Sequence, residues 1–151
     1  MKVVANEVEY YVDAPNPCLQ RVAVPAGKYW LCDPCYGVPE NLWMQLLNSC
    51  DFFDGPVGTV TDSRGGVHHV LGFCTAYGDG CYVDQHGNTY PVDAGLIGLV
   101  PVELGEPGGF GTLVEFKTDT ICINHSGKMQ FGGYKINTRD DEDFDDEEDD
   151  E

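Results

Sequence analysis

Three aspartates and two tyrosines lie within one short, turn-rich stretch of the chain. Asp79, Asp84 and Asp93 alternate with Tyr82 and Tyr90, and glycines flank Asp79. Carboxylates at one end of a hairpin, together with backbone carbonyls, are ligands that Ca²⁺ prefers. Their spacing does not follow the EF-hand loop, which needs acids at alternate positions before a fixed glycine. The stretch therefore indicates either aspartates that cap their own turns or a site for a cation or small molecule.

A C-x-x-C motif is formed by Cys32 and Cys35, with Asp-Pro between them. Such a motif can be half of a zinc site or a redox pair. Zinc needs two further ligands, and of the adjacent His68 and His69 only one can join a given site, because neighbours on a strand point to opposite faces. Asp-Pro favours turn initiation. A structural turn is the main interpretation, with zinc and redox chemistry as alternatives.

Catalytic signatures are not apparent in the sequence. A nucleophilic pair of Cys35 or Cys74 with His69 or His125 has no support from the local sequence. The chain contains no G-x-S-x-G elbow and no phosphate-binding loop that ends in Lys-Ser or Lys-Thr. The glycine-rich residues 105–111 carry an acid and no base, which disfavours phosphate. We therefore predict a protein that is not an enzyme and that has no resident cofactor or metal.

The elements that must position these residues are mostly short strands. Nineteen glycines and nine prolines break the apolar runs, a pattern typical of many strands joined by tight turns. Residues 39–50 differ: they begin with Pro-Glu, which suits a first helical turn, and place leucines on one helical face. We predict a mainly β (α+β) fold, a twisted antiparallel sheet or a small barrel with one covering helix. Predicted strands are residues 8–12, 21–24, 28–32, 57–61, 67–75, 80–83, 89–92, 97–101, 111–116, 121–124, 128–131 and 134–137.

The last twelve residues are eleven carboxylates and one phenylalanine. They begin Asp140, Asp141, Glu142, Asp143, Phe144 and include no base. Such a run repels itself and cannot bury enough apolar surface to fold. We predict a single β-rich domain over residues 1–139, followed by a disordered acidic tail over residues 140–151 that is a candidate partner-binding segment.

The charge of the chain points to a basic partner. Formal net charge is −18, and an acidic body with an acidic tail is repelled by nucleic-acid backbone. A basic protein is the electrostatic complement, and its approach would be steered. The start of the chain has no secretory signal, and no apolar run reaches the ~20 residues that span a bilayer. We therefore expect reduced cysteines, a cytoplasmic setting and no membrane partner.

Aromatic residues form a further candidate surface. The chain has 2 Trp, 8 Tyr and 7 Phe. Tyrosine is favoured where one end of the ring is wet, so some of these residues, Tyr36 among them, are candidates for a partner-facing patch. Cross-strand pairs and the core are the expected place for most of the others.

Two segments together resemble a known group of small proteins. Residues 27–36 read G-K-Y-W-L-C-D-P-C-Y, and residues 76–98 contain Y-G-D-G-C-Y followed by V-D-A-G-L-I-G. These are similar to G-x-Y-x-x-x-D-P-C-Y and Y-G-D-G-x-Y…V-D-A-G-x-I-G motifs in proteins of tailed bacteriophages and some bacteria. The resemblance covers residues 27–101. It implies a phage-type origin rather than a particular reaction, and the acidic tail lies outside it.

These observations favour a non-enzymatic, phage-type accessory protein that binds a basic host protein in the bacterial cytoplasm. Mimicry of nucleic-acid charge by the tail is one means of binding. The alternatives are a module that binds a small molecule or metal at the Asp/Tyr-rich hairpin, and a structural component of the virion. The candidate binding residues are Asp79, Tyr82, Asp84, Tyr90, Asp93, Tyr36, Asp140, Asp141, Glu142, Asp143 and Phe144.

Overall fold

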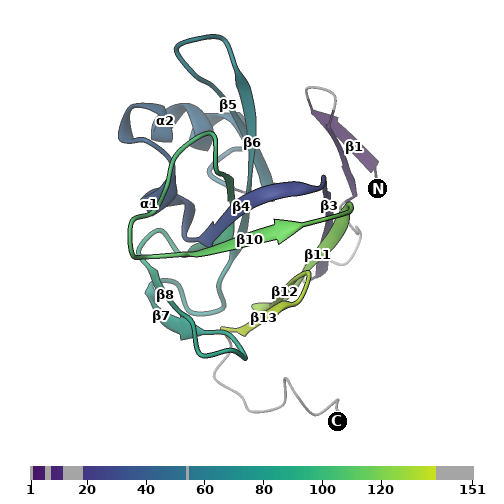
Figure 1. The fold of residues 1–151 in the computed structure, drawn as a ribbon, viewed down its shortest axis with the longest axis vertical. Coiled ribbons are helices and arrows are strands. Elements are labelled where there is room, and N and C mark those ends of the chain that lie inside the picture. Colours follow the sequence, from purple (N-terminus) through teal and green to yellow (C-terminus); the bar gives the residue numbers. More distant parts are fainter. Residues whose placement is uncertain (1, 6–7, 12–18, 54, 139–151) are drawn as a thin grey trace.

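The computed structural model describes residues 2–5, 8–11, 19–53 and 55–138, and the side chains of residues 20–53 and 55–138. Figure 1 shows these residues as a ribbon. The predicted acidic tail, residues 140–151, lies outside the described residues, so its predicted disorder stays a prediction.

The described residues form short strands and two helices. In chain order these are β1 (Lys2–Ala5), β2 (Val8–Tyr11), β3 (Leu19–Val24), β4 (Gly27–Cys32), α1 (Pro34–Gly37), α2 (Glu40–Ser49), β5 (Val57–Thr61), β6 (Val67–Cys74), β7 (Gly80–Val83), β8 (Thr89–Val92), β9 (Leu96–Pro101), β10 (Thr112–Phe116), β11 (Thr120–His125), β12 (Lys128–Phe131) and β13 (Tyr134–Asn137).

Two antiparallel sheets make up the body of the protein. One has five strands in the order β10-β4-β9-β6-β5, and the other has four in the order β13-β12-β11-β3. Two hairpins, β1-β2 and β7-β8, form separate two-stranded sheets. In Figure 1 the helices lie at the upper left and the four-stranded sheet at the lower right, with strands of the five-stranded sheet between them.

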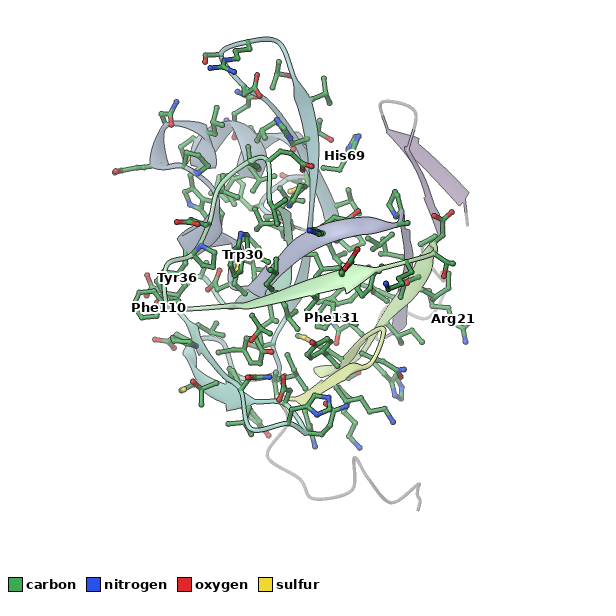
Figure 2. All side chains as sticks on the ribbon, in the orientation of Figure 1. Arg21, Trp30, Tyr36, His69, Phe110 and Phe131 are labelled. Carbon is green, nitrogen blue, oxygen red and sulfur yellow. The ribbon has the colours of Figure 1, made fainter. Side chains whose placement is uncertain are left out.

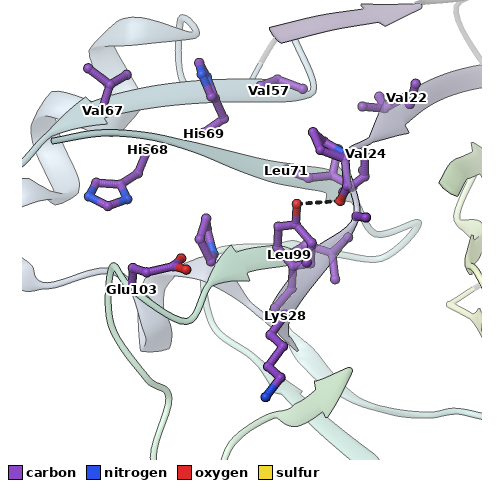
Figure 3. A pocket seen from close by; sticks show the side chains of 16 residues that line it. Val22, Val24, Lys28, Val57, Val67, His68, His69, Leu71, Leu99 and Glu103 are labelled. Atoms are coloured by element: carbon purple, nitrogen blue, oxygen red, sulfur yellow. Dashed lines mark hydrogen bonds between the residues drawn. The ribbon is translucent and has the colours of Figure 1, made fainter. Parts of the chain in front are cut away.

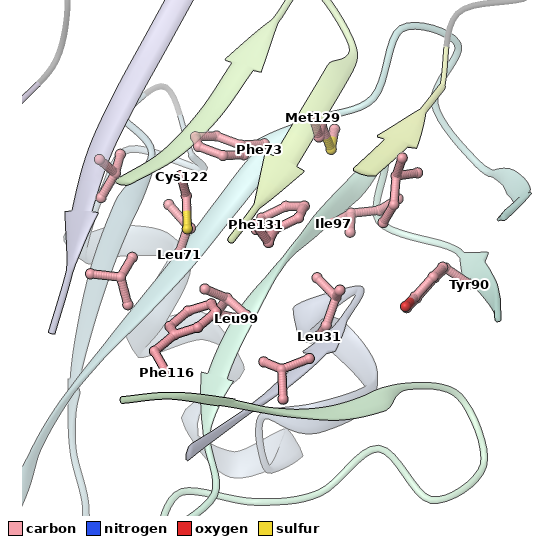
Figure 4. Packing of buried hydrophobic residues seen from close by; sticks show 14 of the residues in the cluster. Leu31, Leu71, Phe73, Tyr90, Ile97, Leu99, Phe116, Cys122, Met129 and Phe131 are labelled. Atoms are coloured by element: carbon pink, nitrogen blue, oxygen red, sulfur yellow. The ribbon is translucent and has the colours of Figure 1, made fainter. Parts of the chain in front are cut away.

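The main core lies between the two larger sheets. Leu99 of β9 pairs with Leu31 on one side and Leu71 on the other, and this buried row faces the four-stranded sheet (Figure 4). The ring of Phe73 lies 5.6 Å from that of Phe131 across the interface. Burying an aliphatic or aromatic side chain of this size stabilises a fold by about 1.5–3 kcal/mol. The four-stranded sheet supplies its share of this core by alternation of buried and more exposed residues, whereas β6 and β9 carry runs of consecutive buried residues.

A second core lies on the opposite face of the five-stranded sheet, under α2. Gly58 of β5 and Gly72 of β6 allow close packing there. A Cβ atom at Gly58 would lie 2.5 Å from Leu46 of the helix, and one at Gly72 would lie 2.7 Å from the ring of Phe53. The missing side chains let the helix and the turn after it approach the strands directly.

The turn after α2 is left-handed over three consecutive non-glycine residues. Asp51, Phe52 and Phe53 have φ angles of 56°, 59° and 62°. This conformation costs about 1–2 kcal/mol per residue in L-amino acids. Burial of Phe53, which is 3% exposed, offsets the cost, whereas Phe52 stays 60% exposed.

The predicted fold class is confirmed. The chain is mostly β, with twisted antiparallel sheets and one longer helix where residues 39–50 predicted it. The sheets do not close into a barrel, so the open-sheet alternative holds. Two elements were not predicted: strand β1, and the single turn of helix α1 at the Asp-Pro position, where we expected a plain turn.

Replacing Gly72 with alanine should lower the free energy of unfolding by about 1–3 kcal/mol, because the new methyl group overlaps the buried ring of Phe53. Gly133→Ala is the matched control, since no atom lies within 4 Å of a Cβ at that position. Urea denaturation of both variants measures the difference. Equal midpoints would show that the helix and its turn do not pack as described.

Candidate functional site

A buried carboxylate joins the two motifs that carry the sequence resemblance. Asp33, between β4 and α1, is 0% exposed. Its Oδ1 accepts the backbone N–H of Cys35 at 3.0 Å. Its Oδ2 accepts the backbone N–H groups of Asp93 at 2.8 Å and Ala94 at 2.7 Å. Hydrogen bonds to an ionised acceptor are about twice as strong as neutral ones, so Asp33 fixes residues 93–94 against the start of α1.

The local sequence explains how α1 forms at this point. Asp33 is the N-cap residue, which accepts an otherwise unsatisfied N–H of the first turn. Pro34 occupies the first helical position, where its missing N–H costs nothing. The resulting turn carries Tyr36 outward, next to the backbone segment that Asp33 holds.

The loop between β9 and β10 completes the site. The backbone of Gly105 approaches the carbonyl of Gly37 so closely that a side chain at position 105 would not fit. The loop then turns at Pro107, whose carbonyl accepts the N–H of Phe110 at 3.2 Å. The Phe110 ring lies 4.8 Å from that of Tyr36, tilted by 34°. Figure 2 shows both rings together at the edge of the molecule.

The aromatic pair is accessible and lies beside carboxylates. Phe110 is 47% exposed, and Asp93 is also exposed. Partial burial, followed by the charges of Cys35, Asp93 and Asp33, raises the pKa of Tyr36 above its usual value. The phenol is therefore neutral at physiological pH, and its ring stands in a negative field. We call Tyr36, Phe110 and Asp93 the aromatic–carboxylate site.

The charge of the sequence segment that contains this site is strongly one-sided. From Tyr29 to Phe116 the chain has a single base, Arg64, against eleven acids. The acids are Asp33, Glu40, Asp51, Asp54, Asp62, Asp79, Asp84, Asp93, Glu103, Glu106 and Glu115. Aromatic faces attract cations, and neighbouring carboxylates add to that attraction. The arrangement suits a lysine or arginine side chain.

The two cysteines of the C-x-x-C motif occupy different surroundings. Cys32 is buried in the core under α2, whereas Cys35 is partly exposed on α1. Burial and the adjacent Asp33 carboxylate raise the pKa of the Cys35 thiol to about 12, and burial raises that of Cys32 as well. Both are therefore thiols rather than thiolates near neutral pH. Within the described residues, no group of three or more His, Cys, Asp or Glu side chains is arranged to hold a metal ion.

Asp84 builds the turn between β7 and β8. Its Oδ1 accepts the N–H groups of His86 and Asn88 at 2.8 and 3.0 Å, and its Oδ2 accepts the Asn88 amide at 2.9 Å and the Tyr90 hydroxyl at 2.7 Å. Burial acts to raise the pKa of Asp84, but these hydrogen bonds outweigh it and lower the pKa. Tyr90 is 0% exposed. The polar groups of Asp84 and Tyr90 are thus engaged in hydrogen bonds within the hairpin.

The other predicted site residues lie in three places. Asp79 is exposed in the turn before β7. Tyr82, in β7, donates its hydroxyl to the carbonyl of Gly78 at 3.1 Å. Asp93 and Tyr36 come together in the aromatic–carboxylate site. Asp140 to Phe144 lie outside the described residues.

The adjacent histidines have separate partners. His68 Nε2 lies 2.9 Å from the Asp62 carboxylate, and His69 Nδ1 lies 3.2 Å from the Thr59 hydroxyl on the neighbouring strand. Both also line a cavity of about 260 Å³ between the larger sheets (Figure 3). Its walls are mainly apolar and include Val22, Val24, Val57, Leu71 and Leu99.

Sequence reasoning missed Phe110 and this cavity. Phe110 stands in a glycine-rich loop that we interpreted only by its lack of bases, although a lone aromatic residue among glycines is a signal for an exposed contact. The cavity draws its walls from several distant segments, so no local pattern marks it.

Comparison with known proteins found no matching family model, no matching curated protein and no matching solved structure. The resemblance to phage-encoded proteins therefore stays a prediction. In the part of the chain that the structure describes, no helix is long and apolar enough to cross a membrane.

Replacing Asp33 with alanine should lower the free energy of unfolding by about 3 kcal/mol or more, because it removes a helix cap and leaves two further N–H groups without an acceptor. The control is Asp79→Ala, an exposed aspartate whose loss should change stability by less than about 0.5 kcal/mol. Chemical denaturation compares the two. Similar losses in both variants would contradict the role assigned to Asp33.

Alkylation tests the state of the Cys35 thiol. At about pH 8 a thiol with a pKa near 12 is ionised in only about one molecule in ten thousand, and the thiolate is the reactive form. Iodoacetamide should therefore modify the exposed Cys81 far faster than Cys35 in the folded protein, as read by peptide mass mapping. Equal rates would show that the pKa of the Cys35 thiol is not raised as described.

Proposed function

We propose that this protein is a non-enzymatic binding protein whose partner is a basic protein, and that the aromatic–carboxylate site takes up a lysine or arginine side chain of that partner. The observation that carries the proposal is the aromatic pair beside the exposed Asp93, in which Phe110 is exposed and Tyr36 is half-buried. An aromatic face contributes about 0.5–1 kcal/mol to binding a cation at an exposed site and about 2 when the cation is desolvated.

The acidic segment 140–151 has a different role in this proposal. Its eleven carboxylates act at longer range and raise the rate of encounter with a basic surface. Screening by salt weakens this steering, whereas short-range contacts at the aromatic pair are less sensitive. The segment attracts the partner, and the aromatic–carboxylate site supplies specificity. A phage-type origin would make the partner a host protein in the bacterial cytoplasm.

A second candidate function is the binding of a small apolar molecule. The observation that favours it is the cavity of about 260 Å³ between the sheets, whose walls are mainly aliphatic. Small-molecule sites are mostly apolar with a few polar groups, and His69 and Glu103 would supply such groups here. We therefore propose the cavity as the site of this alternative, rather than the hairpin, where Asp84 and Tyr90 already bond to each other.

The first test uses a defined probe, a short arginine-rich peptide, titrated into the full-length protein and followed by NMR. Phe110→Ala should weaken binding about threefold to tenfold, in line with the loss of one cation–π contact, and Asp93→Asn should weaken it by a similar factor. The backbone N–H at position 93 is retained, so Asp33 keeps its bond.

Matched controls distinguish an effect of the aromatic–carboxylate site from the effect of removing any exposed aromatic ring or any negative charge. Phe52→Ala removes an aromatic ring that is 60% exposed elsewhere on the surface, and Asp79→Asn removes an equal charge. Neither should change peptide affinity at about 0.15 M salt, where distant charges are screened. If each control weakens binding as much as its test variant, the aromatic–carboxylate site is not the contact. Capture from bacterial lysate with wild type and Phe110→Ala would then identify site-dependent partners.

A further inference from the structure

The outer face of the four-stranded sheet is basic in an acidic protein. Strands β3, β11, β12 and β13 contain no aspartate or glutamate. Their buried residues, such as Val22, Cys122 and Met129, face the core. Because side chains alternate along a strand, the residues between them face outward. The outer face holds Arg21, Ala23, Ile121, Ile123, His125, Lys128, Gln130, Lys135 and Asn137.

The strand register arranges these residues in rows across the sheet. Arg21 pairs with Ile123, Ile123 with Gln130, and Gln130 with Lys135. Arg21 and Lys135 therefore lie at the two edges of the row, and Ile123 lies between them. Ile121, on the same strand, is 49% exposed. Four strands span about 14 Å at ~4.8 Å per interval. The face is a strip of this width with positive edges and an apolar middle.

This outer face is remote from the aromatic–carboxylate site. In Figure 2 Arg21 lies on the right of the molecule, and Tyr36 and Phe110 lie on the far left. Three bases, Arg21, Lys128 and Lys135, thus share this face, and the eleven acids of residues 29–116 lie outside the strands of the four-stranded sheet. An occupant of the outer face should be an anionic segment with an apolar residue.

We propose that the outer face of the four-stranded sheet binds residues 140–151 of the same chain. The first argument is charge: the segment carries eleven carboxylates and no base, which complements a face with Arg21, Lys128 and Lys135. The second is composition, because its one apolar residue, Phe144, matches the isoleucines in the middle of the strip.

The third argument is where the segment starts. Thr138 directly follows β13 and is 2% exposed. Its hydroxyl donates to the Gly127 carbonyl at 2.7 Å and accepts the N–H of Ala76 at 2.9 Å. The chain is thereby fixed beside the outer face, two residues before Asp140. Six residues from Thr138 to Phe144 reach about 20 Å at ~3.3 Å each, enough to cross the strip.

Because residues 140–151 are covalently linked to the sheet, weak contacts are enough to hold them on its outer face. A segment linked by a few residues has an effective concentration in the millimolar range at its own sheet. The regulatory consequence rests on the proposed function: a basic partner that engages residues 140–151 must displace them from this face. The docking itself is a property of the free protein, so it is tested without any partner.

The test is NMR of the full-length chain. In a tail-neutral variant the eleven carboxylates of residues 140–151 are replaced by asparagine and glutamine. Relative to wild type, the backbone amide signals of Arg21, Ile123 and Gln130 should shift, and those of Tyr36 and Phe110 should not. About 1 M salt should bring the wild-type signals to the variant positions, since it screens the contact. Unchanged signals across the sheet would overturn the proposal.

A second pair of variants keeps residues 140–151 intact. Lys128→Gln combined with Lys135→Gln should move the amide signal of Phe144 toward its position at high salt. The matched control, Lys28→Gln combined with Lys117→Gln, removes the same charge from exposed positions outside the four-stranded sheet and should leave Phe144 unchanged. Equal shifts in both variants would mean that net charge, and not this face, is responsible.

Other occupants give distinct results. If dilution removes the signal differences between the wild type and the tail-neutral variant, the face binds residues 140–151 of a second copy. The intramolecular proposal is then wrong. A single-stranded oligonucleotide added to the full-length protein should not shift Arg21 or Ile123, because residues 140–151 occupy the face. If the oligonucleotide shifts these signals in the wild type as much as it does in the tail-neutral variant, the face is open and binds nucleic acid.

Discussion

The candidate site depends on one buried carboxylate. Asp33 accepts N–H groups from both the α1 turn and residues 93–94, so it joins two segments that are sixty residues apart in sequence. A buried carboxylate is costly unless hydrogen bonds satisfy it, and here both oxygens are used. These bonds hold the backbone of residues 93–94 against the start of α1, which carries Tyr36. The loop that carries Phe110 also packs on α1, and so it depends on the same carboxylate.

The two large sheets give this site a rigid base and separate charges of opposite sign. Eleven acids lie within residues 29–116, which include both helices, the β7–β8 hairpin and most of the five-stranded sheet, whereas the four-stranded sheet has bases and no acids within its strands. The core between them fixes the distance between the two surfaces, because packed interiors resist deformation. A protein with a net charge of −18 thereby keeps one basic face.

Local patterns were enough to predict the elements but not their long-range contacts. The Pro-Glu start and the leucine spacing predicted α2, and short apolar runs between turn signals predicted most strands. Helix α1 is four residues long, too short for periodicity to reveal. The Asp33–Asp93 link could not be predicted, because a single sequence does not show which distant N–H groups a buried aspartate will bond. Asp84 was foreseen as a possible turn cap, and its four hydrogen bonds agree with that interpretation.

The surroundings of the site also set its chemistry. Burial raises the pKa of the Cys35 thiol, and the adjacent Asp33 carboxylate adds to this effect. A nucleophilic cysteine needs the opposite environment, with positive charge or a helix dipole that favours the thiolate. Tyr36 is held neutral by its surroundings in a similar way. The groups at this surface are therefore a neutral phenol, an exposed phenyl ring, a protonated thiol and a carboxylate. Such a set attracts a cation without activating a nucleophile, which favours noncovalent recognition of a basic side chain over covalent catalysis.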